Sequence, residues 1–265
     1  MPVRLLAALF LLVLPAGATP FPHALLDQVL RTQVDAAGRV DYAALKQNPA
    51  LLDAYLDSLG QCSPHRQPDR FPTPRHKLAY WINAYNALVL RGVVDGYPVS
   101  RVDELGGLEV FFRQRLHNLG GEQLTLDQLE SQIIRPEYRD PRIHFALNCG
   151  ALGCPALLNR AYTGETLDSL LDSRARHFAA DPSQVHLDLQ AGKLVLSQIL
   201  NWYGEDFTRW FPTTAAAVPP APTLIEYLLI YLPQDQAALL RQHPGLEIVF
   251  SEYDWTLNDR PPLLK

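Results

Sequence analysis

Residues 142–155 of this 265-residue chain concentrate the groups that could do chemistry, in the order Arg-Ile-His-Phe-Ala-Leu-Asn-Cys-Gly-Ala-Leu-Gly-Cys-Pro. They hold two of its three cysteines, Cys149 and Cys154, and one histidine, His144, inside an apolar run. A cysteine nucleophile needs a base that generates its thiolate and a third group that orients the base. One hypothesis is therefore a thiol-dependent hydrolase or acyl transferase, with Cys149 as nucleophile and His144 as base, acting on an amide or ester.

The same two cysteines suit a structural role. In an oxidising compartment, Cys149 and Cys154 most simply form a disulfide. So short a loop gains about 2 kcal/mol of stability from its bridge and takes a fixed shape. His144 is then a hydrogen-bonded partner of Glu130 or of a backbone carbonyl. The alternative function is a non-catalytic module whose loop shapes a pocket for a small-molecule or peptide ligand.

Redox and metal chemistry fit the spacing less well. The gap between the cysteines is wider than the two-residue gap of thioredoxin-like sites. His144, Cys149 and Cys154 give two of the ligand types that zinc prefers, but no fourth ligand is evident. There is also no phosphate loop and no dinucleotide fingerprint. We therefore expect neither a metal nor a cofactor.

Apolar and polar residues alternate over residues 142–148, which predicts a strand with one apolar face. Alternation places His144 and Cys149 on opposite faces, so they meet only where the strand bends. A chain reversal at Gly150 brings Cys154 back beside His144 instead.

The strongest helix prediction covers residues 74–94. This segment is apolar on nearly every side, which is typical of a helix buried at the centre of a domain. Asn83 and Asn86 are then buried amides that need hydrogen-bond partners. Asn83 is also a candidate donor to an oxyanion.

A second helix over residues 125–135 would position an acid. Thr125 and Gln128 have the spacing of a capping box, and an apolar stripe follows. Glu130 lies off that stripe, which makes it a candidate to orient His144.

The remaining patterns predict a mostly helical α+β fold, with a central buried helix packed on a small, largely antiparallel sheet. Further helices are expected at residues 23–32, 41–59 with a break at Pro49, 166–178, 198–211, 223–232 and 235–242, with a hairpin at 185–196 and a last strand at 247–250. Residues 96–121 are expected to be a connector, and Cys62 to lie in a surface loop because polar residues and prolines follow it.

The first residues have the pattern of a signal peptide. Arg4 precedes an apolar run at residues 5–14, and Ala16-Gly17-Ala18 fits the small-x-small cleavage rule. We expect cleavage after Ala18 and a periplasmic or secreted protein. No later stretch predicts a membrane span.

Composition and net charge indicate which classes of binding partner to expect. The chain is 48% hydrophobic and 19% charged, which is ordinary for a globular protein. Its net charge of −5, with no basic block, gives no reason to expect nucleic acid as a partner. A small-molecule or peptide ligand is expected, and the oligomeric state stays open.

Several motifs together resemble the domain-of-unknown-function family 547. They are residues 80–86, residues 126–135, residues 142–155, Trp202-Tyr203 with Asp206-Phe207, and residues 253–258. The resemblance covers roughly residues 70–258, which we take as one domain. Residues 19–69 are then an N-terminal helical extension and residues 259–265 a Pro-rich tail. The resemblance implies a shared fold and a shared site, and it implies no particular activity.

The residues that match the family pattern and carry functional side chains are Asn83, Asn86, Glu130, Arg142, His144, Asn148, Cys149, Cys154, Asp254 and Asn258. Besides the candidate catalytic groups above, Arg142, Asn148, Asn86 and Asp254 are candidates for ligand binding. Structural roles are the alternative: Arg142 pairs with a carboxylate, while Asp254 and Asn258 hold the C-terminal turn.

Overall fold

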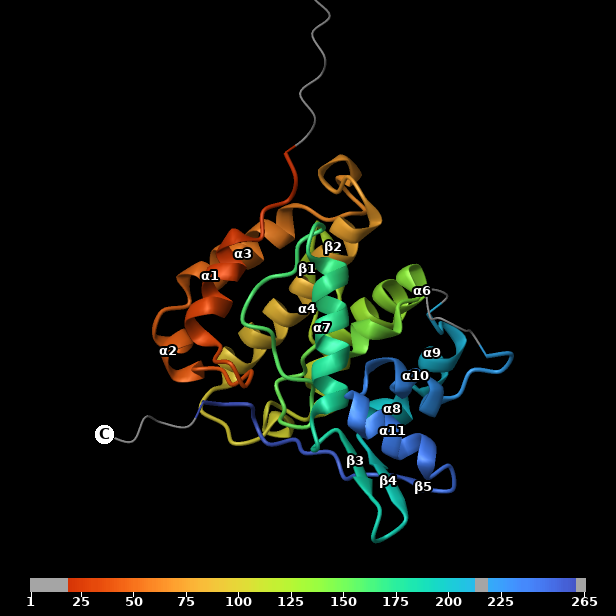
Figure 1. The fold of residues 1–265 in the computed structure, drawn as a ribbon. Coiled ribbons are helices and arrows are strands. Elements are labelled where there is room, and N and C mark those ends of the chain that lie inside the picture. The colour runs from red at the N-terminus through yellow and green to blue at the C-terminus, as the bar shows by residue number, and fades with distance from the viewer. Residues whose placement is uncertain (1–18, 213–218, 261–265) are drawn as a thin grey trace, which may run out of the picture.

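The structure is a computed structural model that describes residues 19–212 and 219–260 (Figure 1). The expected signal peptide, residues 1–18, lies outside the described residues. So do residues 261–265 of the expected tail. The described part is mostly helical with two small sheets, which confirms the predicted α+β class.

Helix α4 (Pro74–Gly96) runs through the middle of the molecule (Figure 1). It begins after Thr73, whose side chain accepts a hydrogen bond from the amide of His76. Pro74 lies in the first turn, where a backbone N–H would have no partner within the helix, so its missing N–H costs nothing. Every residue from 78 to 94 except Arg91 is buried. The prediction of a central buried helix is therefore confirmed, although its main neighbours are other helices.

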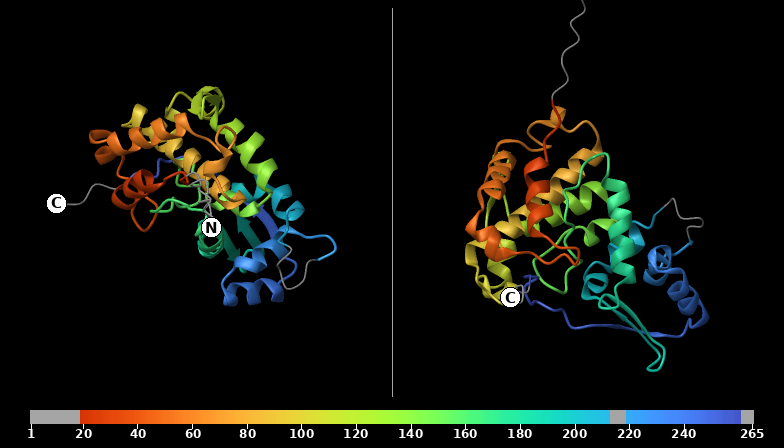
Figure 2. Two further views of the ribbon diagram at one scale, coloured as in Figure 1. Left: turned by 90° about the horizontal axis from the view of Figure 1, so that it is seen from above. Right: turned by 60° about the vertical axis from the view of Figure 1, so that its left-hand side comes forward.

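The N-terminal helices pack along one side of α4 (Figures 1 and 2). They are α1 (Ala24–Gln33), α2 (Tyr42–Gln47) and α3 (Ala50–Gln61). Pro49 separates the last two, as predicted.

Cys62 corrects the prediction of a surface loop, since only 2% of it is exposed. It ends α3, and its carbonyl accepts a hydrogen bond from the Tyr80 hydroxyl of α4 at 2.7 Å. This long-range bond holds the start of the polar stretch against the core. Polarity of the following residues was therefore a poor guide to the place of Cys62.

A hairpin lies where a connector was expected. Strand β1 (His117–Leu119) pairs with β2 (Glu122–Leu124), and Gly120 and Gly121 make the turn with φ values of +64° and +89°. A continuous helical segment follows: α5 (Leu126–Gln128), the π-helical η4 (Leu129–Ile134) and α6 (Arg135–Tyr138). Its capping box between Thr125 and Gln128 is present as predicted.

Residues 142–148 do not form the predicted strand. Pro141–Phe145 is instead a short 3₁₀ helix, η5, and the side chain of Asp140 accepts a hydrogen bond from the amide of Arg142 at its start. Ile143 belongs to the core around α4, whereas Phe145 belongs to a second core. The alternation in sequence reflects a segment between two cores, with apolar residues directed into each.

The C-terminal part builds the second core. Helix α7 (Leu167–Ala180) leads into β3 (Val185–Asp188) and β4 (Lys193–Leu196), which are antiparallel, and β5 (Glu247–Phe250) adds in parallel to β4. The predicted hairpin and last strand are thus confirmed. The helices between β4 and β5 are α8 (Gln198–Trp202), α9 (Gly204–Arg209), α10 (Leu224–Tyr231) and α11 (Gln234–Gln242).

The segment after β5 ties the two parts together. It runs back along the underside of the molecule toward the N-terminal helices (Figure 2). There Asp259 forms a bridge with Val40. On its way it passes the loop that carries Cys149 and Cys154, because Leu257 pairs with Ala151.

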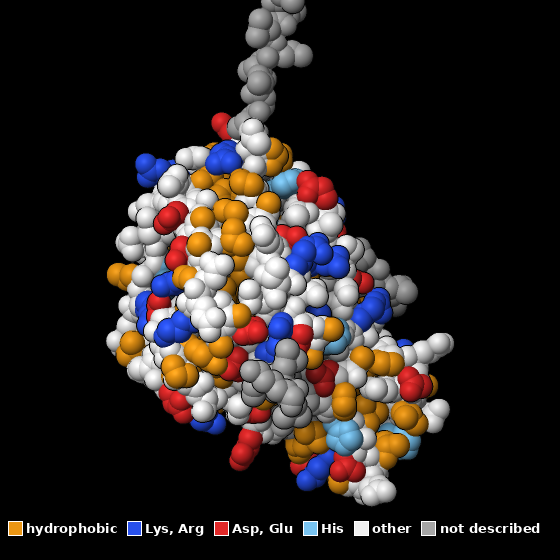
Figure 3. Space-filling model, turned by 90° about the vertical axis from the view of Figure 1, so that its left-hand side faces the viewer, with side chains coloured by type: hydrophobic (Ala, Val, Ile, Leu, Met, Phe, Trp, Pro, Cys, Tyr) orange, Lys and Arg blue, Asp and Glu red, His pale blue; other side chains and the backbone are white. Residues whose placement is uncertain are grey.

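Acidic and basic side chains are interspersed on the face that Figure 3 presents. Within residues 19–212 and 219–260, no helix has both the length and the apolar character required to cross a bilayer.

Candidate functional site

The loop after η5 reverses at Gly150 and closes on itself through a disulfide between Cys149 and Cys154, whose Cα atoms are 6.1 Å apart. Gly150 has a φ of +83°, a conformation that favours glycine. The sequence is compatible with either a free Cys149 thiol or a Cys149–Cys154 disulfide, and the structure contains the disulfide.

The C-terminal segment fixes the far side of this loop. The amide of Leu152 donates to the Thr256 carbonyl, and that of Gly153 to the Asp254 carbonyl, both at 2.8 Å. A Cβ on Gly153 would lie 2.9 Å from the backbone nitrogen of Asp254, so this close approach requires glycine. Asp254 also accepts a bond from the amide of Thr256, which holds the turn locally.

Buried amides attach the near side of the loop to α4. Asn86 accepts a hydrogen bond from the amide of Asn148 at 2.9 Å and donates to the Ala146 carbonyl at 3.0 Å. Asn148 in turn accepts from the amide of Gly150 and donates to the Pro155 carbonyl. These amides hold the backbone of the disulfide loop in place.

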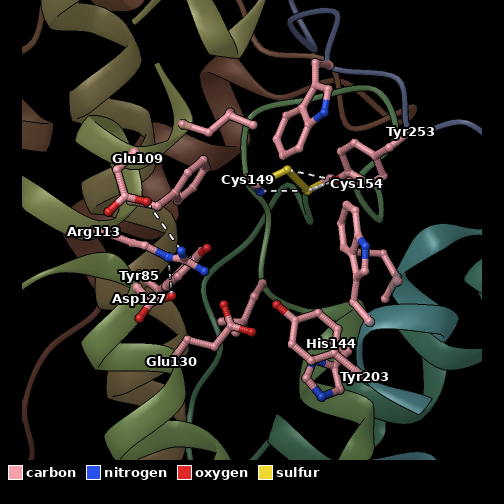
Figure 4. A pocket seen from close by; sticks show the side chains of 16 residues that line it. Tyr85, Glu109, Arg113, Asp127, Glu130, His144, Cys149, Cys154, Tyr203 and Tyr253 are labelled. Carbon is pink, nitrogen blue, oxygen red and sulfur yellow. Dashed lines mark hydrogen bonds and ion pairs between the residues drawn. A yellow bond between two sulfur atoms is a disulfide. The ribbon is translucent and has the colours of Figure 1, made fainter. Parts of the chain in front are cut away.

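A pocket of about 380 Å³ opens beside the disulfide (Figure 4). Both cysteines, His144 and Glu130 line it, so the structure brings these predicted residues to one cavity. Figure 4 shows the disulfide at one end and His144 at the other.

Aromatic rings form one wall of the pocket. The ring of Tyr253 lies 4.8 Å from that of Trp202 and 4.5 Å from that of Trp255, measured between centroids. Half of Trp202 is exposed. The Tyr253 hydroxyl lies 3.0 Å from Sγ of Cys149 and 3.1 Å from Sγ of Cys154. Burial, with the nearby charges of Glu130 and Asp254, raises the pKa of Tyr253, so its hydroxyl stays protonated and its single hydrogen is shared between the two sulfurs.

Charged side chains form the facing wall (Figure 4). Arg113 pairs with Glu109 at 3.3 Å and with Asp127 at 3.2 Å. Glu130 has no ion pair with any Lys, Arg or His of the described residues. Burial and then the charge of Glu130 raise the pKa of both Tyr85 and Tyr203, which flank the same cavity.

His144 belongs to a buried charged group at the end of the pocket. Its Nε2 lies 2.9 Å from Oδ2 of Asp206, and Nε of Arg135 lies 2.7 Å from the same oxygen. Its ring stacks on Tyr203 at 4.0 Å. Burial acts to raise the pKa of Asp206, but hydrogen bonds from His144 and Arg135 outweigh it and keep this pKa below its usual value. The ionised carboxylate accepts a hydrogen bond from the N–H at Nε2.

This group corrects the role expected for Glu130, because the partner of His144 is Asp206. The sequence contains Asp206 three residues after Tyr203, but nothing local indicates that it reaches a histidine 62 residues earlier. Within the described chain, no hydrogen bond joins His144 to either sulfur.

The other predicted residues lie away from this pocket. Both polar ends of Asn83 are occupied by the backbone of Tyr162, at 2.8 and 3.0 Å. Arg142 binds Asp140 and Asp168, the structural role considered for it. Asn148 and Asp254 line a second cavity, which shares Cys154 and Tyr253 with the first. Asn258 is buried and accepts a bond from Tyr42.

Sequence reasoning missed most of the pocket. It did not single out Arg113, Asp127, Tyr203, Tyr253 or Trp255 as site residues, because they come from separate segments. One signal was present: Glu109 and Arg113 are four residues apart, as in a helical ion pair. In the part of the chain that the structure describes, no three His, Cys, Asp or Glu side chains are grouped so that they could hold a metal.

Residues 70–179 match the family described as "Protein of unknown function, DUF547". The resemblance is thus confirmed for this range, which holds α4, η4 and the disulfide loop. The motifs at residues 202–207 and 253–258 lie outside the matched range. Comparison with curated proteins finds no match, and comparison with solved structures finds none either.

Proposed function

We propose that the chain is a ligand-binding protein that takes a small organic or peptide ligand into the cavity between its aromatic and charged walls. The observation that carries this proposal is the Cys149–Cys154 disulfide. The two sulfurs of the pocket are bonded to each other and lie within hydrogen-bond distance of the Tyr253 hydroxyl, so neither is a nucleophile in this state.

The form of the cavity supports binding. Small-molecule sites are typically concave, rich in aromatic side chains, and roughly 300 to 1,000 Å³ in volume. The pocket, at about 380 Å³, falls in this range and has a few polar groups facing its rings. The disulfide and the amides of Asn86 and Asn148 hold its frame rigid, which lowers the entropic cost of binding.

A thermal-shift screen of small molecules and short peptides tests the proposal. A ligand of the pocket raises the melting temperature of the wild type, because it binds only the folded chain. The shift is lost in Trp202→Ala, which removes an exposed wall residue, and kept in Leu116→Ala, which removes an exposed apolar residue outside the pocket. The proposal fails when no hit depends on Trp202.

Export into an oxidising compartment is part of the same proposal. The pattern of residues 1–18 supports a signal peptide, and export favours the disulfide. N-terminal sequencing of the protein from cell fractions checks this. A mature chain beginning at Thr19 in an exported fraction agrees with it, and an intact Met1 in the cytoplasm contradicts it.

A thiol-dependent hydrolase or acyl transferase is the second candidate. The observation in its favour is that Cys149 faces the pocket and is partly exposed, so reduction would present a thiol there. His144 lies at the other end of the cavity, held by Asp206. This activity therefore needs both a reductant and a rearrangement.

Blocking of free thiols before lysis, followed by peptide mapping, separates the two candidates. A bridged Cys149 in its native compartment favours the binding protein. A free Cys149 that alkylates fast near neutral pH favours the enzyme, because fast alkylation reports a depressed pKa.

A further inference from the structure

We infer that the pocket selects a ligand with a positively charged amine, and that Glu130 is the counter-ion of this amine. The inference rests on the proposed ligand-binding function and names the class of ligand.

The charges that line the pocket do not balance. Glu109, Asp127 and Glu130 are acidic, whereas Arg113 is the only Lys or Arg among the described residues lining it. Arg113 divides its guanidinium between Glu109 and Asp127, and both ion pairs are exposed to solvent. An excess of negative charge is left on the charged wall.

Glu130 is the half-buried carboxylate of this wall that forms no ion pair with a described Lys, Arg or His. Arg135, five residues later, is close enough for Glu130 to help raise its pKa, after a larger effect from its hydrogen bond to Asp206. Its guanidinium already binds both oxygens of Asp206, at 2.7 and 3.1 Å. Arg135 therefore forms its ion pair with Asp206 and not with Glu130. A half-buried carboxylate that has no ion pair favours a ligand that supplies a positive charge.

The rings around Glu130 suit the same ligand. Glu130 acts on the hydroxyls of Tyr85, Tyr203 and Tyr253, whose pKa values are all raised by burial first and then by this carboxylate. These tyrosines stay neutral, so they can donate hydrogen bonds but cannot cancel the charge. Aromatic faces also attract cations within about 6 Å of their centroids. A protonated amine at Glu130 gains from the carboxylate and the rings together.

Neutral and anionic ligands gain less. A sugar could stack on Trp202 and Tyr253 and bond to the carboxylates, but it would bury Glu130 without a counter-charge. A carboxylate ligand would meet like charge on the wall and has only the engaged Arg113 to bind.

Probes that share a benzyl group and differ in charge, together with a neutral sugar, test the inference on the mature chain. Benzylamine, benzyltrimethylammonium, benzyl alcohol, phenylacetate and methyl glucoside are titrated at neutral pH, by calorimetry and by tryptophan fluorescence, because Trp202 and Trp255 line the pocket. We expect both ammonium probes to bind at least about tenfold more tightly than benzyl alcohol. We expect phenylacetate not to bind.

Glu130→Gln removes the charge and keeps the shape. It should weaken the ammonium probes by at least about tenfold and leave benzyl alcohol unchanged. Glu205→Gln is the matched control, because it removes an equal charge from an exposed ion pair with Arg209 outside the pocket and should change affinity less than about threefold. Circular dichroism verifies that both variants fold. If one does not, the comparison of probes on the wild type still tests the preference for an amine.

The outcomes distinguish the inference from the function beneath it. Equal binding of benzyl alcohol or methyl glucoside, lost in Trp202→Ala, overturns the amine and keeps the binding pocket. Ammonium binding that is unchanged in a folded Glu130→Gln also overturns the inference. Absence of ammonium binding does so too, while the wider ligand screen decides separately whether the pocket binds anything.

Discussion

The imidazole Nε2 of His144 lies 2.9 Å from Oδ2 of Asp206, and both side chains are almost fully buried. Arg135 holds the same carboxylate from the other side. The histidine at the end of the pocket is therefore oriented by a buried charged group that joins η4–α6, η5 and α9. Removing any one of these three side chains leaves a hydrogen-bonding or charged group of the others without its partner.

Asp206→Asn should destabilise the protein by about 2 to 4 kcal/mol, because it removes a buried carboxylate that holds His144 and leaves the partly buried Arg135 without its counter-ion. Urea unfolding at neutral pH measures the loss. Glu205→Gln is the neighbouring control, since Glu205 pairs with Arg209 in an exposed contact and its change should cost under about 1 kcal/mol. Equal losses in the two variants would contradict the arrangement.

Acid should act through the same carboxylate. The pKa of Asp206 is lower in the folded protein than in the unfolded chain, where it is about 3.9. Its contribution to stability is thus fully present above about pH 5 and is lost as the pH falls through the folded value. Unfolding free energies measured from pH 6 to pH 3 should fall less steeply in Asp206→Asn than in the wild type.

His23 should make the protein sensitive to pH in a higher window. Burial, and to a lesser extent the charge of His76, lowers the pKa of His23 to about 4, from about 6.5 in the unfolded chain. Below pH 6.5, His23 is protonated in the unfolded chain but stays neutral in the folded protein, so the free energy of unfolding falls as the pH drops toward 4. Between pH 7 and 4.5 this amounts to about 2 to 3 kcal/mol.

His23→Gln checks this assignment, because glutamine can still hydrogen-bond to Tyr55 but does not titrate. Its stability should change less than that of the wild type between pH 7 and 4.5. His243→Gln is a suitable control, since His243 is exposed at the end of α11. The same pH slope in all three proteins would show that His23 is not the source.

The elements that sequence predicted well are those whose pattern is local. The apolar surface of α4, the capping box at Thr125 and the break at Pro49 each depend on residues within a few positions of one another. Such patterns report the helix and its ends directly, whatever the helix packs against.

The elements that it missed depend on distant partners. Alternation at residues 142–148 predicted a strand because a sequence does not tell one core from two, and here Ile143 and Phe145 enter different ones. Cys62 was placed outside because its bond to Tyr80 spans two helices. The pairing of His144 with Asp206 and the convergence of the pocket walls likewise follow from tertiary packing.

Gly153→Ala should disturb the disulfide loop. The added Cβ would meet the backbone nitrogen and carbonyl oxygen of Asp254 at 2.9 and 3.0 Å, which cannot move like a flexible side chain. We expect a loss of about 1 to 3 kcal/mol and weaker binding in the pocket, because Tyr253 precedes that backbone. Gly204→Ala is the control, since a Cβ there would meet no atom within 4 Å and α9 begins at that residue. It should be neutral or slightly stabilising, and a loss equal to that of Gly153→Ala would refute the steric explanation.

The cysteines should differ in their reaction with iodoacetamide. In the oxidised native protein, Cys149 and Cys154 are bonded to each other and Cys62 is buried, with a pKa that burial raises. Because alkylation needs an accessible thiolate, the native protein should react very slowly. Unfolding in urea without a reductant should release one reactive thiol, and peptide mapping should assign it to Cys62. Addition of dithiothreitol should then expose the other two. Cys62→Ser should abolish the first reaction alone, and rapid labelling of Cys149 in the untreated native protein would contradict the bridge on which the proposed binding function depends.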